Sequence, residues 1–175
     1  MSAQRSLAHE ACRVALATLA LASATAFVVW VVGNGDELRE QLGFRFDGPT
    51  RQTRDALESA ASNGRLAAAQ LLAAWVVASH RRLRRPLDVT LALVLLLNTT
   101  AVGIALGAYG SRLLASVALH GPLELAAFSL AGGAYLAARV GELGAGRLAI
   151  AAGVAVVLVA AGAVGETYVR IGGDG

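Results

Sequence analysis

The chain has 175 residues, of which 56% are hydrophobic and only 15% are charged, and its mean hydropathy is +0.60. A soluble domain has about a quarter of its residues charged, so this composition argues against a soluble protein and favours a polytopic membrane protein. The formal charge of +3 does not indicate nucleic-acid binding, because the basic residues stand between the apolar runs and form no single patch.

Five apolar stretches predict five membrane helices. We expect an all-α, polytopic helical bundle that forms a single integral membrane domain over residues 1–175, with the lipid bilayer around it. The predicted spans are residues 14–33, 66–79, 89–108, 122–140 and 148–165. The first is too long for the apolar part of a signal peptide and is interpreted as a retained anchor. The second is short, and we expect its helix to begin upstream, within residues 53–63.

Arginine residues predict how these spans are oriented. Four of them crowd the short connection between the second and third spans: Arg81, Arg82, Arg84 and Arg85. Positive charge near the ends of spans favours the cytoplasmic side. We therefore predict a multi-pass protein of the cell (cytoplasmic) membrane with its N-terminus inside and its C-terminus outside. Residues 34–64, where arginine and acidic residues are mixed, form the extracytoplasmic loop.

The fourth apolar stretch, Leu113–Val140, is longer than the ~20 residues that a membrane helix needs. Gly121 and Pro122 interrupt it, and proline lacks the N–H group that the interior of a helix requires. We predict a helix break at these two residues. The part before the break, Leu113–Leu119, is expected to be a short helix that is re-entrant or lies near the outer surface. The span itself then starts at Pro122, which suits a first helical turn.

Three polar residues fall inside or beside the predicted spans. His120 and Glu124 flank the break, and Asn98 lies near the middle of the third span. Charged and amide side chains are costly in hydrocarbon without a partner. We predict that these three residues form one polar cluster in the outer half of the bundle, which either fixes the register of the helices or handles a proton or an ion.

Metal binding and catalysis have less support in the sequence. His120 and Glu124 offer two ligands, whereas zinc takes three or four, so no metal and no other cofactor is expected. Ser116 and Ser129 have no arrangement of base and orienting group around them, and we expect no catalytic residues and no enzymatic activity. Close helix packing is predicted where glycines recur in the third and fourth spans: Gly103, Gly107, Gly132 and Gly133.

Residues 120–125, with the sequence HGPLEL, resemble the pattern His-Gly-x-x-Glu-Leu of the stage II sporulation protein M family. In that family the pattern opens a membrane helix whose second half is rich in glycine. Two further segments are similar to the family: Asn98 followed by Gly103 and Gly107, and Asn63-Gly64-Arg65-Leu66-Ala67. The resemblance covers about residues 63–141, and it departs from the family at Thr99, where glycine is expected.

The resemblance implies a membrane protein without a catalytic activity of its own. Founding members of the family belong to a complex that recruits cell-wall hydrolases during engulfment of a forespore, but members also occur in organisms that never sporulate. We therefore expect a scaffold or membrane subunit of a cell-envelope complex, whose partners are other membrane or envelope proteins or a second copy of the chain. The alternative is a transporter or channel-like component in which His120 and Glu124 bind a proton, an ion or a ligand.

Overall fold

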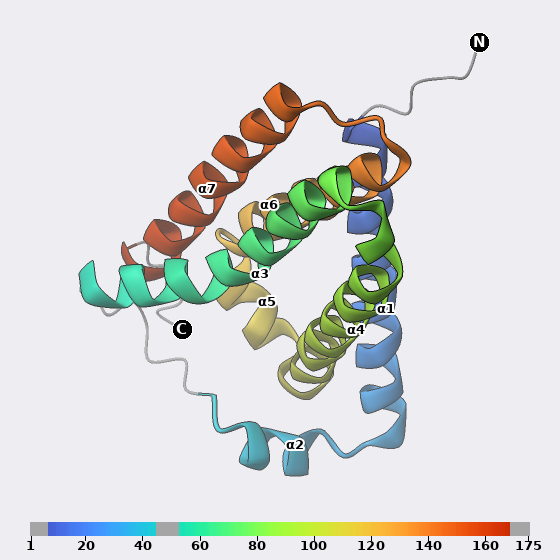
Figure 1. Ribbon diagram of the computed structural model, residues 1–175. Coiled ribbons are helices and arrows are strands. Elements are labelled where there is room, and N and C mark those ends of the chain that lie inside the picture. Colours follow the sequence, from blue (N-terminus) through green and yellow to red (C-terminus); the bar gives the residue numbers. More distant parts are fainter. Residues whose placement is uncertain (1–6, 45–52, 169–175) are drawn as a thin grey trace.

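The computed structural model describes residues 7–44 and 53–168, which form helices joined by short turns (Figure 1). No β-strand occurs within these ranges, so the all-α prediction is confirmed for the described part of the chain. The α-helices are α1 (Leu7–Val32), α2 (Gly35–Leu42), α3 (Thr53–Ser79), α4 (Arg84–Tyr109), α5 (Ser111–Val117), α6 (Gly121–Val140) and α7 (Ala145–Tyr168). A 3-10 turn, Arg81–Leu83, connects α3 to α4.

Among the residues that the structure describes, four helices are long and apolar enough to cross a membrane: α1, α4 with the 3-10 turn before it, α6 and α7. On α1, α4 and α7 many large apolar side chains are exposed, for example Trp30, Val89 and Ile150. Such surfaces are unfavourable in water over a large contiguous area, and they suit a helix that lies against lipid. The fold is therefore compatible with a membrane protein.

Helix α3 is as long as the spanning candidates but is less apolar. It extends over 27 residues and begins at Thr53, upstream of Leu66. Its first half carries charged and polar side chains, including Arg54, Glu58 and Asn63, and it is not one of the four apolar helices. The fifth membrane crossing thus stays a prediction.

Helix α6 lies at the centre of the bundle, where it contacts α1, α3 and α7. Nearly all of its buried residues are small: Ala127, Ser129, Ala131, Gly132, Gly133, Ala134, Tyr135, Ala137 and Ala138. Small side chains allow neighbouring helices to approach closely on several sides, which explains why this helix occupies the central position.

The four glycines predicted to pack helices all lie against α1. A methyl group at Gly103 of α4 would lie 2.6 Å from Thr25 Cβ, and one at Gly107 would lie 2.6 Å from Val29 Cβ. On α6, a methyl group at Gly133 would lie 2.6 Å from the backbone nitrogen of Ala11, and Gly132 faces Val14. At Gly103, Gly107 and Gly133 these distances are too short for any side chain, so the close approach of α1 to α4 and α6 requires glycine there. At Gly132 the nearest atom, Cγ1 of Val14, would lie 3.1 Å from the methyl group, and Val14 would have to shift slightly.

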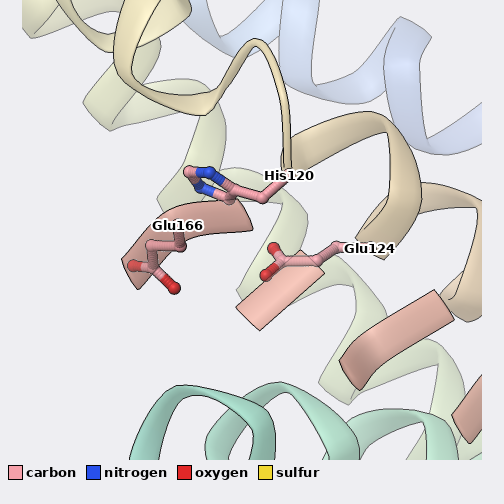
Figure 2. Close-up of side chains that lie close together, drawn as sticks. All are labelled: His120, Glu124 and Glu166. Atoms are coloured by element: carbon pink, nitrogen blue, oxygen red, sulfur yellow. The ribbon is translucent and has the colours of Figure 1, made fainter. Parts of the chain in front are cut away.

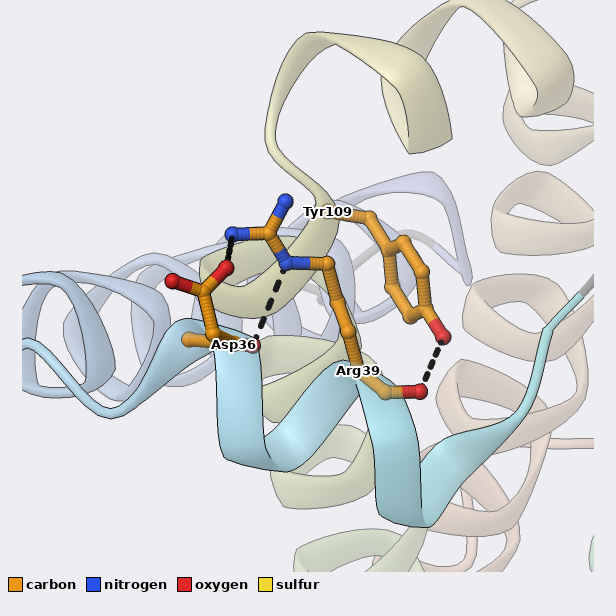
Figure 3. A network of polar contacts seen from close by, with 4 residues as sticks. Asp36, Arg39 and Tyr109 are labelled. Atoms are coloured by element: carbon orange, nitrogen blue, oxygen red, sulfur yellow. Dashed lines mark hydrogen bonds and ion pairs between the residues drawn. The ribbon is translucent and has the colours of Figure 1, made fainter.

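The segment after α1, which the sequence predicts as part of a loop, contains a short helix, α2. The hydroxyl of Tyr109, at the end of α4, donates a hydrogen bond of 3.0 Å to the carbonyl oxygen of Arg39 (Figure 3). The same hydroxyl accepts a hydrogen bond from the backbone N–H of Phe44 at 3.1 Å, and the guanidinium group of Arg39 pairs with Asp36. These contacts hold α2 against the end of α4.

Candidate functional site

The candidate site lies at the start of α6, where the chain changes direction. Helix α5 ends at Val117, three residues form a turn, and α6 begins at Gly121 with Pro122 in its first turn. Proline is favourable at this position because the first N–H groups of a helix have no partner within the helix. The interruption in the sequence therefore coincides with a helix start, and His120 stands immediately before it.

Two side chains of this helix start face a third from α7 (Figure 2). His120 and Glu124 are one helical turn apart, and the backbone N–H of Glu124 donates to the carbonyl oxygen of His120 at 3.0 Å. Glu166 comes from the last turn of α7. One imidazole nitrogen and one oxygen of each carboxylate lie within 4.8 Å of one another. His120 and Glu124 are half-buried, whereas Glu166 is exposed at the rim.

A third helix contributes an amide to the same group. Asn63 of α3 donates a hydrogen bond from Nδ2 to Oε1 of Glu124. Asn63 appears in the sequence only as part of a family-like segment, with no predicted link to Glu124. We name His120, Glu124, Glu166 and Asn63 the outer cluster. It joins α3, α6 and α7 through polar side chains.

Two glycines of α7 make room for the outer cluster. A methyl group at Gly162 would lie 3.2 Å from Cγ of Glu124, and one at Gly165 would lie 3.4 Å from the side chain of Leu119. Both glycines are buried. A larger residue at position 162 would therefore push the Glu124 side chain away from its place beside Glu166.

Asn98 does not take part in this cluster, contrary to the expectation from the sequence. Its side chain is exposed on α4, and Nδ2 donates a hydrogen bond of 2.8 Å to the carbonyl oxygen of Val94 in the same helix. The reason lies in how α4 packs: Thr99 and Gly103 are buried, with Gly103 against α1, so the adjacent Asn98 points outward. The structure brings Asn63, not Asn98, to Glu124.

A second polar group at the other end of α6 is absent from the sequence prediction. The hydroxyl of Tyr135 donates to Asp88 Oδ1 at 2.8 Å, and Nε of Arg139 donates to Asp88 Oδ2 at 3.0 Å. Asp88 belongs to α4, so this group ties α4 to α6. A lone carboxylate three residues after Arg85 is a usable signal, but the sequence does not indicate which residue of α6 it meets.

The chemistry of the outer cluster is that of a small cation or proton site. It combines an imidazole nitrogen with two carboxylates, groups that exchange protons or bind metal ions. Ser116, the nearest serine in the sequence, donates its hydroxyl to the carbonyl oxygen of Leu113 at 2.8 Å, within its own short helix. That bond directs the hydroxyl toward the backbone, so the geometry gives Ser116 no role in the cluster.

No family model, no curated protein and no solved structure matches this chain.

Proposed function

We propose that this chain is a non-enzymatic subunit of a cell-envelope complex, held in the membrane by its apolar helices. The observation that carries the proposal is the position of Asn98, an exposed side chain in the middle of α4. Exposed apolar residues lie around it on the helix, among them Leu97 and Val102. An amide that faces hydrocarbon is unfavourable, and a hydrogen bond to a neighbouring membrane helix offsets that cost. A partner helix on this face of α4 explains why an amide stands there.

The hydrogen-bonding capacity of Asn98 supports a partner. Among the described residues, its side chain makes one hydrogen bond, from Nδ2 to Val94. A side-chain amide has two N–H donors and an acceptor oxygen, so a donor and the acceptor remain for another helix. We propose that this helix belongs to a different envelope protein, which makes α4 the docking element of a scaffold.

The resemblance to the stage II sporulation protein M family agrees with this role. The residues that carry the resemblance include His120, Glu124 and Asn63, which meet in the outer cluster. In this proposal the outer cluster fixes the arrangement of α3, α6 and α7, and the exposed face of α4 stays available for the partner. The proposal includes no role in sporulation, because members of that family also occur in organisms that never sporulate.

The test is a pull-down from native membranes in a mild detergent, with co-purifying proteins identified by mass spectrometry. We expect the wild-type protein to capture a specific membrane protein that the Asn98→Leu variant loses. The control is Thr90→Val, which removes an exposed polar group two turns earlier on α4. It should keep the partner, because a residue near the end of the helix is closer to water.

Two results would contradict the proposal. Equal capture by wild type and Asn98→Leu would show that this face of α4 is not the docking surface. If the wild-type protein runs only as a monomer or as an oligomer of itself, the scaffold role is wrong, and transport becomes the function to test.

A second candidate function is favoured by the presence of Glu166 in the outer cluster. Two carboxylates and an imidazole in one place form a group that a transporter or channel-like protein uses to bind and release a proton or an ion. In that case Glu124→Gln abolishes ion movement in proteoliposomes while the protein stays folded. A scaffold tolerates the same substitution, because the amide oxygen of glutamine still accepts the hydrogen bond from Asn63.

A further inference from the structure

The outer cluster has the donor atoms of a metal site. Its three ligand-bearing residues, His120, Glu124 and Glu166, supply one nitrogen and two oxygens within 4.8 Å of one another. From the sequence, only the first two were expected to meet, and two ligands are too few for zinc. Glu166 raises the number to three, the number of protein ligands that an open zinc site has. The fourth position of such a site is taken by water or by an external ligand.

The charges around the cluster also favour a cation. Two carboxylates held this close repel each other unless a positive charge or a proton lies between them. Glu166 stands in the last turn of α7, where the partial negative charge of the helix C-terminus is unfavourable to a carboxylate. A divalent cation bound by both carboxylates would relieve the repulsion between them.

We propose that His120, Glu124 and Glu166 bind one divalent transition-metal ion, with zinc as the best fit to the donors. An imidazole nitrogen suits zinc better than calcium or magnesium, which prefer oxygen ligands alone. Zinc bonds to nitrogen and oxygen are about 2.0–2.2 Å long, which places tetrahedral ligands about 3.4 Å apart. The donor atoms lie within 4.8 Å of one another, so they need to approach by no more than about 1.4 Å, and the exposed Glu166 side chain has space to rotate.

The surroundings of the site suit this role. Asn63 donates to Glu124 Oε1, which orients the carboxylate as outer hydrogen-bond partners do in metal sites. A methyl group at position 162 would lie 3.2 Å from Cγ of Glu124, so glycine at this position leaves that side chain the space it needs. Glu166 is exposed and lies in the last turn of α7, so the protein itself leaves this side of the site open. The site is formed within one chain, so it does not depend on the partner proposed above.

The test uses the full chain, purified in detergent with a tag that contains no histidine run. Cys12, the single cysteine, is exposed and is replaced by serine so that no thiol competes for the metal. The protein is stripped with a chelator and titrated with zinc in the presence of a chromogenic chelator of known affinity. We expect it to retain one zinc ion per chain, and we expect cobalt(II), bound in place of zinc, to give the visible absorption of a four-coordinate site.

The decisive variant is Glu166→Gln, because this side chain is exposed and its replacement leaves the helix packing intact. We expect its zinc affinity to fall at least about tenfold, with a similar loss for His120→Gln and Glu124→Gln. The matched controls are Glu37→Gln on α2 and His80→Gln before α4, both exposed and remote from the cluster. They should bind zinc as the parent protein does. Gel filtration and the far-ultraviolet circular dichroism of stripped samples check that each variant is folded.

Thermal unfolding gives a second measurement. Zinc should raise the melting temperature of the parent protein and of both controls, and it should raise that of Glu166→Gln by clearly less at the same zinc concentration, because weaker binding to the folded state stabilises it less. The proposal is overturned if the parent protein releases zinc to the chelator without retaining an equivalent. It is also overturned if Glu166→Gln and Glu37→Gln bind zinc equally well, since the metal would then sit elsewhere.

Discussion

At the scale of single residues, the environments of two asparagines differ from what their positions in the sequence suggest. Asn98 lies in the middle of an apolar helix and is exposed, whereas Asn63 lies in a polar stretch and bonds to Glu124. The difference follows from which face of each helix meets its neighbours. In a helix of 3.6 residues per turn, consecutive side chains differ in direction by about 100°. The neighbour of a packed residue such as Thr99 therefore points away from the packed face.

The first prediction concerns the glycines of α4. Gly103→Ala should lower the free energy of unfolding by about 1–3 kcal/mol, because its methyl group would lie 2.6 Å from Thr25 Cβ and 2.7 Å from the carbonyl oxygen of Ala22. The measurement is unfolding of the purified protein in detergent, followed by circular dichroism. Gly153→Ala is the control, because nothing lies within 4 Å of the added methyl group. It should be neutral or slightly stabilising, and a similar loss at both positions would contradict the prediction.

The second prediction concerns the polar group of Asp88, Tyr135 and Arg139. Tyr135→Phe removes the hydrogen bond of 2.8 Å to Asp88 and should destabilise the protein by about 0.5–1.5 kcal/mol. A double-mutant cycle with Asp88→Asn isolates the pair, because each single change also affects other contacts. If the effects of Tyr135→Phe and Asp88→Asn simply add, the two side chains do not interact, and the bond contributes nothing.

At the scale of elements, the start of α6 is the feature that the sequence identifies best. Gly121 and Pro122 predict a break, and the structure begins α6 at Gly121 with a proline in its first turn. The reason is local: a proline lacks an N–H group and its ring clashes with the carbonyl group of the preceding turn, which kinks or ends a helix. The sequence predicts an extracytoplasmic loop over residues 34–64, and within this segment the structure has the short helix α2. This helix is held by contacts to Tyr109, far away in sequence, which no local pattern reveals.

The third prediction follows from the place of Pro122. Pro122→Ala should change the free energy of unfolding by less than about 1 kcal/mol, because the first turn of a helix does not require the missing N–H. Ala131→Pro, in the buried middle of α6, should cost about 3 kcal/mol or more, since it removes a backbone hydrogen bond and clashes with the preceding turn. Thermal unfolding in detergent measures both. A large loss for Pro122→Ala would mean that the proline maintains the turn itself.

At the scale of the whole molecule, α3 runs along the length of α6. Asn63 meets Glu124 near the start of α6, and Val77 packs in a cluster with Tyr135 and Ala138 near its end. Helix α7 runs the other way beside them, because Gly162 faces Glu124 while Leu148 packs against the same cluster as Val77. If α3 crosses the membrane as a fifth span, it has to run parallel to α6 and antiparallel to α7. The structure has this arrangement, although the first half of α3 is polar.

The fourth prediction tests that crossing by labelling single cysteines in a Cys12→Ser background. With five crossings and the N-terminus inside, a reagent that cannot pass the membrane should label Glu37→Cys in intact cells. It should reach His80→Cys only after the membrane is opened, because α3 then returns the chain to the cytoplasm. Both positions are exposed in the structure. Labelling of both in intact cells would mean that α3 does not cross and that the chain has four spans.

The sequence by itself determined the features that depend on composition and local chemistry. They are an all-helical fold with long apolar helices, the break before α6 and the glycines at close packing positions. Hydropathy, proline and glycine act through the nearest residues, so they can be interpreted without a fold. Only the tertiary structure decided which polar side chains meet: Glu166 and Asn63 join Glu124, Asp88 joins Tyr135, and Asn98 is left outside. These pairings depend on the rotation and direction of whole helices, which are set by the packing of many residues at once.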